Sequence, residues 1–132
     1  MQNRKRIAQA LVVLGSLVLL AGATLHGIGG YQVAFGALGR TGLPHRIIGA
    51  LKAVWLFASW HWIAVDIFAL IAAFARTRPR RVILLLCGLV PLVDAAGAYV
   101  AVGLFIGDEL LALAALAFLA GAALFPPAPA EL

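Results

Sequence analysis

The chain has 132 residues, of which 64% are hydrophobic and only 11% are charged, with a formal net charge of +5. About half of the residues of a soluble domain are apolar and about a quarter are charged, so this composition lacks the polar surface of a soluble protein. It excludes a soluble catalytic domain and predicts a small integral membrane protein.

Four apolar segments follow one another, at about 7–28, 47–75, 82–106 and 108–126. A helix needs about 20 apolar residues to cross a hydrocarbon core of about 30 Å. The first three segments are long enough, and the fourth reaches this length only with its flanking residues. We therefore predict an all-α, integral membrane four-helix bundle that forms one transmembrane domain over residues 1–132, in a plasma (cytoplasmic) membrane.

The first segment also has the features of a secretory signal peptide, because Arg4, Lys5 and Arg6 precede the apolar run and Ala21-Gly22-Ala23 offers a small-residue cleavage site. We interpret it instead as a retained first transmembrane helix. His26 would lie toward its outer end.

Basic residues predict the orientation, because short cytoplasmic loops are rich in Lys and Arg. Seven basic residues flank the presumed inner ends of the helices, against three on the outer side (Arg40, Arg46 and Lys52), and the loop before the fourth helix carries Asp108 and Glu109. This distribution favours both termini inside. The second connection should meet anionic lipid headgroups, through Arg76, Arg78, Arg80 and Arg81. Headgroups account for the basic charge, so we expect no nucleic-acid partner.

The connection between the first two helices, at about 27–45, contains six glycines among apolar residues. It is too apolar for a solvated loop and too rich in glycine for a good helix. We expect a Gly-rich interfacial or re-entrant loop, which either covers the bundle or gates a ligand site. Pro44 suits the first turn of the second helix.

The second helix carries polar side chains at helical spacing. Lys52, Trp55, Ser59, Trp62 and Asp66 follow each other by three or four residues and share one face. His61 lies outside this face, five residues from Asp66.

Asp94 of the third helix should lie at a depth between His61 and Asp66, because a short connection makes the two helices neighbours. An ionised carboxylate inside a membrane costs several kcal/mol, about 3 or more, unless it is paired, protonated or hydrated. We therefore expect a buried His/Asp site for proton-linked transport or binding of a small ligand. Its candidate residues are Asp94, Asp66, His61, His26, Ser59 and Trp62. The alternative is a hydrogen-bonded clasp that only fixes helix packing.

A second hypothesis is a redox subunit, because two membrane histidines on neighbouring helices can ligate a haem iron or join a carboxylate around a metal ion. Here His26 and His61 would hold a haem or a quinone.

A third hypothesis is an accessory subunit of a larger membrane complex. The fourth helix is rich in alanine, and small residues allow close helix packing in lipid. Ala117 with Gly121, and Gly103 with Gly107, form two small-xxx-small pairs that serve either packing within the chain or a homodimer or larger complex.

No recognised catalytic motif is present, so an enzyme is not favoured. His61 and Asp66 match the H-x-x-x-x-D pattern, which resembles that of glycerolipid acyltransferases, but on one helix these side chains point apart. Cys87 is the only cysteine, which excludes a disulfide within the chain.

Overall fold

The computed structural model describes residues 2–75 and 79–125, and these residues form helices joined by short links, without strands. This confirms the all-helical class, and four helical stretches are long and apolar enough to cross a membrane, which is consistent with a multi-pass membrane protein. In chain order the described elements are α1 (Gln2–Thr24), the π-helical η1 (Leu25–Gly30), α2 (Tyr31–Leu38), α3 (His45–Phe74), α4 (Arg80–Val102) and α5 (Ile106–Leu124).

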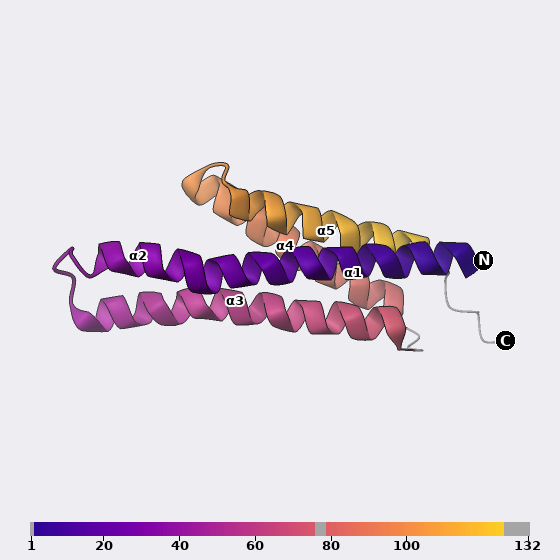
Figure 1. The fold of residues 1–132 in the computed structure, drawn as a ribbon, viewed down its shortest axis with the longest axis horizontal. Coiled ribbons are helices and arrows are strands. Elements are labelled where there is room, and N and C mark those ends of the chain that lie inside the picture. Colours follow the sequence, from indigo (N-terminus) through magenta and orange to yellow (C-terminus); the bar gives the residue numbers. More distant parts are fainter. Residues whose placement is uncertain (1, 76–78, 126–132) are drawn as a thin grey trace.

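The helices form two antiparallel hairpins of different length (Figure 1). The continuous helix α1-η1-α2 has 37 residues and pairs with the 30-residue α3, whereas α4 and α5 have 23 and 19 residues. At 1.5 Å per residue, the longest helix measures about 55 Å and the shortest about 29 Å. The α2 end of the long hairpin therefore extends past the short hairpin, which diverges from α1 toward the link between α4 and α5.

The connection expected as a Gly-rich interfacial or re-entrant loop is largely helical, and only residues 39–44 interrupt the helices. The expectation of a loop is therefore wrong for residues 27–38, which are helical. In lipid the backbone must satisfy its own hydrogen bonds, which favours a helix despite the glycines. Two glycines also face α3, because a Cβ at Gly27 would lie 3.0 Å from Ser59 Oγ and one at Gly30 would lie 2.8 Å from Trp55 Cζ2.

The third and fourth spans are shifted relative to the sequence prediction. α4 ends at Val102, where Gly103 adopts a φ of +82°, and α5 begins at Ile106. Gly103 and Gly107 therefore do not form a small-residue pair on one helix. Gly107 instead lies beneath the ring of Phe105.

The small residues of α5 pack within the chain. A Cβ at Gly121 would approach Val12 Cγ2 of α1 to 2.9 Å, and a Cβ at Gly15 of α1 would lie 3.1 Å from the Cβ of Ala117. On the other side, a Cβ at Gly88 of α4 would lie 2.7 Å from Leu119 Cγ. Ala117 and Gly121 thus bring α5 close to α1, as expected for packing in lipid. A homodimer or larger complex through this helix stays a prediction.

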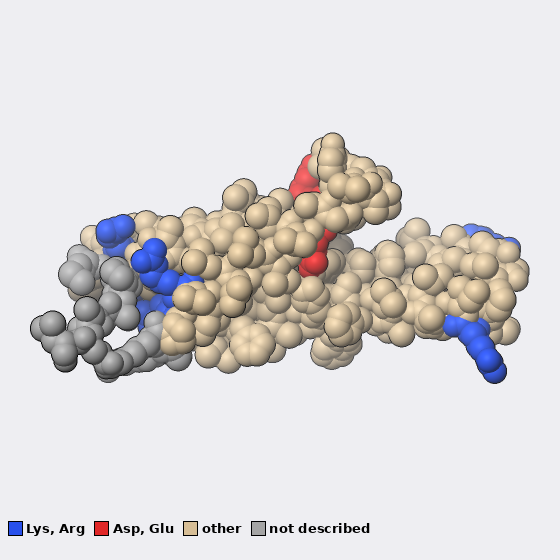
Figure 2. Space-filling view, turned by 180° about the vertical axis from the view of Figure 1, so that it is seen from behind, with Lys and Arg blue, Asp and Glu red and all other residues tan. Residues whose placement is uncertain are grey.

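Lys and Arg side chains lie at the two ends of the long axis, and acidic side chains lie near its middle (Figure 2). Arg80, at the start of α4, joins the ends of three helical segments. Its guanidinium donates hydrogen bonds to the Ala72 and Ala75 carbonyl oxygens and lies 4.8 Å from the centre of the Phe125 ring. It thereby caps the last turn of α3. Arg76 and Arg78 lie outside the described residues, and the orientation of the chain in the membrane stays a prediction.

Candidate functional site

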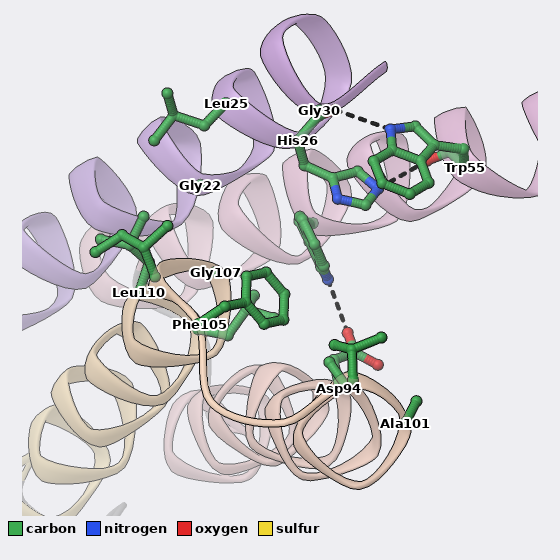
Figure 3. A pocket seen from close by; sticks show the side chains of 15 residues that line it. Gly22, Leu25, His26, Gly30, Trp55, Asp94, Ala101, Phe105, Gly107 and Leu110 are labelled. Carbon is green, nitrogen blue, oxygen red and sulfur yellow. Dashed lines mark hydrogen bonds between the residues drawn. The ribbon is translucent and has the colours of Figure 1, made fainter. Parts of the chain in front are cut away.

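A cavity of about 700 Å³ opens between η1, α3, α4 and the first turns of α5 (Figure 3). Its lining residues lie where the short hairpin diverges from the long one. Its walls are mostly apolar, and five residues contribute rings or an ionisable group: His26, Trp55, Trp62, Asp94 and Phe105. The volume is that of a typical site for a small organic molecule.

His26 and Trp55 join η1 to α3 through two hydrogen bonds. Trp55 Nε1 donates to the His26 carbonyl oxygen at 2.9 Å, and His26 Nε2 lies 3.2 Å from the Trp55 carbonyl oxygen. Because a carbonyl oxygen only accepts, this contact places a proton on His26 Nε2. The rings are also stacked, with centroids 4.1 Å apart and an interplanar angle of 8°. Both bonds are visible in Figure 3.

The local sequence explains this pair of hydrogen bonds, which we call the His26–Trp55 clasp. Trp55 lies on the polar face of α3, and Gly30 leaves room for its indole ring. The π-helical turn makes the backbone N–H of Tyr31 donate to the His26 carbonyl oxygen, five residues earlier. That oxygen therefore accepts from both Tyr31 and Trp55. Single π-helical turns of this kind occur frequently at functional sites.

Asp94 is held from α3 by two neighbouring residues. Trp62 Nε1 donates to Asp94 Oδ2 at 2.8 Å, and His61 Nε2 lies 3.6 Å from the same oxygen. The side chains of His61 and Asp94 are each 30% exposed. His61 thus reaches Asp94 although it lies outside the polar face of α3, because Asp94 packs at the edge of that face. Trp62 also contacts the His26 ring edge to face, at 5.0 Å between centroids.

Asp66 and Ser59 are buried elsewhere along α3, and neither lines the described cavity. Asp66 is 7% exposed and lies beside the hydroxyl of Ser16 on α1. Ser59 packs against Gly27. Among the described residues, Ser59 Oγ and Asp66 Oδ1 have no hydrogen-bond partner. The polar face predicted on α3 thus points into the protein, but of its residues only Trp55 and Trp62 line the cavity.

Asp108 is a buried residue that the sequence reasoning placed in an exposed outer loop. It is 4% exposed, and both carboxylate oxygens lack a hydrogen-bond partner among the described residues. The short link starts α5 at Ile106, which puts Asp108 in the first helical turn, where the helix dipole favours a negative charge. The paired acidic residues before an apolar run are the sequence signal that could have indicated this position.

The structure brings only one of the two histidines of the redox hypothesis to the cavity. His26 lines it, whereas His61 lies beside Asp94 and is not among the lining residues that the structure describes. Within residues 2–75 and 79–125, no group of three or more His, Cys, Asp or Glu side chains is arranged to hold a metal ion. Haem or quinone binding through His26 and His61 stays a prediction.

No protein-family model, curated protein or solved structure matches this chain. Its function must therefore be argued from the chemistry of the site, since a helical membrane bundle alone implies no activity.

Proposed function

We propose that this protein binds a small, mainly apolar molecule from the surrounding lipid, in the cavity between η1, α3, α4 and α5, and that binding is linked to a proton on Asp94. A single carboxyl group in a mostly apolar cavity of about 700 Å³ carries the proposal. Sites for small molecules combine apolar walls with a few polar groups that fix the orientation of the ligand.

The position of the cavity supports a ligand that arrives from lipid. Val102 and Ile106, which contribute to its wall, are 73% and 64% exposed, and in a membrane such apolar surface faces acyl chains. The short hairpin diverges from the long one in the part of the molecule whose residues line the cavity. An apolar molecule dissolved in the bilayer therefore reaches the site without crossing a polar barrier.

Asp94 and His61 support the link to a proton. A carboxyl group inside a membrane has to be paired, protonated or hydrated, and the described partners of Asp94 Oδ2 are Trp62 Nε1 at 2.8 Å and His61 Nε2 at 3.6 Å. A ligand that supplies a compensating polar or charged group favours the carboxylate and releases the proton. His61 Nε2 lies 3.6 Å from Asp94 Oδ2, and its side chain is 30% exposed, so it is positioned beside the carboxyl group that exchanges the proton.

Binding is tested with the purified protein in lipid nanodiscs, using the fluorescence of Trp55 and Trp62 as the reporter in a Trp60→Phe background. Three triphenyl probes of similar size are titrated: triphenylphosphine oxide, methyltriphenylphosphonium and triphenylacetate. We expect at least one probe to change the fluorescence saturably. The substitution Ala98→Phe, which fills the cavity wall, should abolish this change, whereas Ala96→Phe on the exposed side of α4 should preserve it.

The proposal fails if no probe gives a saturable change, or if Ala98→Phe binds the probes as well as Ala96→Phe does. Proton linkage is measured on the same samples in weak buffer with a pH indicator dye. We expect binding to release protons from the unsubstituted protein and not from Asp94→Asn. Equal release from both proteins would contradict the role of Asp94.

A further inference from the structure

The cavity is lined by one carboxyl group, that of Asp94, and His61 Nε2 lies 3.6 Å from its Oδ2. Of its described lining residues, Asp94 is the only acidic one and none is a lysine or arginine. Lys52 is engaged elsewhere, with its Nζ 5.8 Å from the ring centres of Tyr31 and Phe35. Arg80 caps α3 at the opposite end of the molecule. The basic side chains thus lie toward the two ends, away from the cavity (Figure 2).

One carboxylate oxygen of Asp94 is free to bind a ligand. Oδ2 accepts the hydrogen bond from Trp62 and lies near His61, whereas Oδ1 accepts no hydrogen bond from the described residues. The side chain is partly exposed, and Figure 3 shows its carboxylate at the cavity, across from Phe105. Trp62 fixes the rotamer of Asp94 and leaves the second oxygen available for a positive or hydrogen-donating group.

Aromatic side chains line the same cavity as this carboxylate. Trp55, Trp62 and Phe105 line the cavity together with His26, whose ring packs on both tryptophans. The faces of indole and phenyl rings attract cations, most strongly where water is excluded. Such rings in the same cavity as one carboxylate favour a delocalised or alkylated cation over an anion or a neutral molecule.

We infer that the ligand of this cavity is a lipophilic organic cation of single positive charge, whose charged centre lies at Asp94 and the aromatic rings and whose apolar body lies against Leu110 and Leu111. The inference rests on the proposed function and specifies its ligand class. The remaining wall is apolar, so it favours a bulky alkyl or aryl body. A single carboxylate matches a single charge.

The three triphenyl probes separate the ligand class from binding itself, because they are similar in size and differ in charge. Methyltriphenylphosphonium carries one positive charge, triphenylphosphine oxide is neutral, and triphenylacetate is negative. In nanodiscs of neutral lipid, we expect the cation to bind at least about tenfold more tightly than the neutral probe, as for a desolvated cation beside aromatic rings and a carboxylate. The anion should bind more weakly than both.

Asp94→Asn should reduce this preference to about threefold or less, mainly by weakening the binding of the cation. Glu109→Gln, an equal change of charge at an exposed position of α5, should leave the preference unchanged. Neutral and cationic probes that bind equally to the unsubstituted protein, or a preference that survives Asp94→Asn, would overturn the inference. If the neutral probe still binds and Ala98→Phe abolishes its binding, the cavity remains a binding site and only the ligand class is wrong.

Discussion

Trp55 and Trp62, two turns apart on α3, direct their indole N–H groups to different partners. Trp55 binds the backbone of η1, whereas Trp62 binds the carboxylate of Asp94 on α4. Trp60 lies between them in sequence but points outward, with 68% of its surface exposed. The position of each tryptophan around the helix therefore determines its role. Trp55 joins α3 to η1, Trp62 anchors Asp94, and Trp60 faces outward.

Replacing Trp62 with phenylalanine tests the anchor. The ring is retained, but Asp94 loses its only described hydrogen bond. We expect the free energy of unfolding to fall by about 1 kcal/mol, the usual net value of one such bond. Unfolding of the protein in mild detergent, followed by circular dichroism, measures the change. Trp60→Phe is the matched control and should change stability by less than about 0.5 kcal/mol; equal effects of the two substitutions would contradict the anchor role.

Gly30 and Gly29 test the clasp at neighbouring positions. A Cβ at Gly30 would come within 2.8 Å of the Trp55 ring, which its stacking and hydrogen bond hold in place, whereas a Cβ at Gly29 would meet nothing within 4 Å. We expect Gly30→Ala to lower the free energy of unfolding by about 1–3 kcal/mol. Gly29→Ala should leave it unchanged or raise it slightly, because alanine favours helix. The same unfolding assay compares the two variants. An unchanged free energy of unfolding in Gly30→Ala would show that the Trp55 ring can move aside, which would contradict a fixed clasp.

Residue spacing predicted which side of α3 faces inward, because the period of a helix alone determines which side chains share a face. It did not predict that Asp66 and Asp94 lie in separate environments. That separation depends on the lateral packing of α1 against α3, where Ser16 lies beside Asp66. Asp108 was misplaced for a related reason, since its burial depends on the residue at which α5 begins.

At the scale of elements, glycine has opposite uses in η1 and α4. In η1, glycines leave room for side chains of α3, and the helix continues. At Gly103, a positive φ ends α4 and allows a short link to α5. Composition alone could not distinguish these uses, because a glycine-rich segment fits both a loop and a closely packed helix. For this reason the loop expected at 27–45 is limited to residues 39–44 in the structure.

The contact between α4 and α5 can be tested at Gly88. Its added Cβ would lie 2.7 Å from Leu119 Cγ and 3.2 Å from the Ala115 carbonyl oxygen, so the backbone of α5 would have to move. We expect Gly88→Ala to destabilise the protein by about 1–3 kcal/mol. The control is Gly97→Ala on the same helix, where a Cβ would meet nothing within 4 Å and stability should be retained. Thermal unfolding compares the pair, and similar midpoints would refute close α4-α5 packing at Gly88.

At the scale of the whole molecule, span number and helical class were predictable, because length and hydropathy determine how many helices can cross a bilayer. The described helices match that count. The orientation is predicted from the distribution of Lys and Arg alone, which places the starts of α1 and α4 on the cytoplasmic side.

Orientation can be measured with single cysteines, since Cys87 is buried and is the only cysteine of the chain. In a Cys87→Ala background, Thr41→Cys tests the exposed link between α2 and α3, and Asn3→Cys tests the start of α1. We expect a membrane-impermeant maleimide added to intact cells to label position 41 and to spare position 3 until the membrane is opened. The reverse pattern would show the opposite orientation.

The unequal hairpins also make the protein sensitive to bilayer thickness. A hydrocarbon core of about 30 Å matches the 19-residue α5 but leaves about 25 Å of the 37-residue helix outside it. No single bilayer thickness suits both hairpins, and the cavity lies at the level where the shorter one ends. On the proposed function, longer acyl chains would cover the mouth of the cavity and shorter ones would expose it to headgroups and water. The lipid composition of the membrane would then help to set how readily the cavity fills.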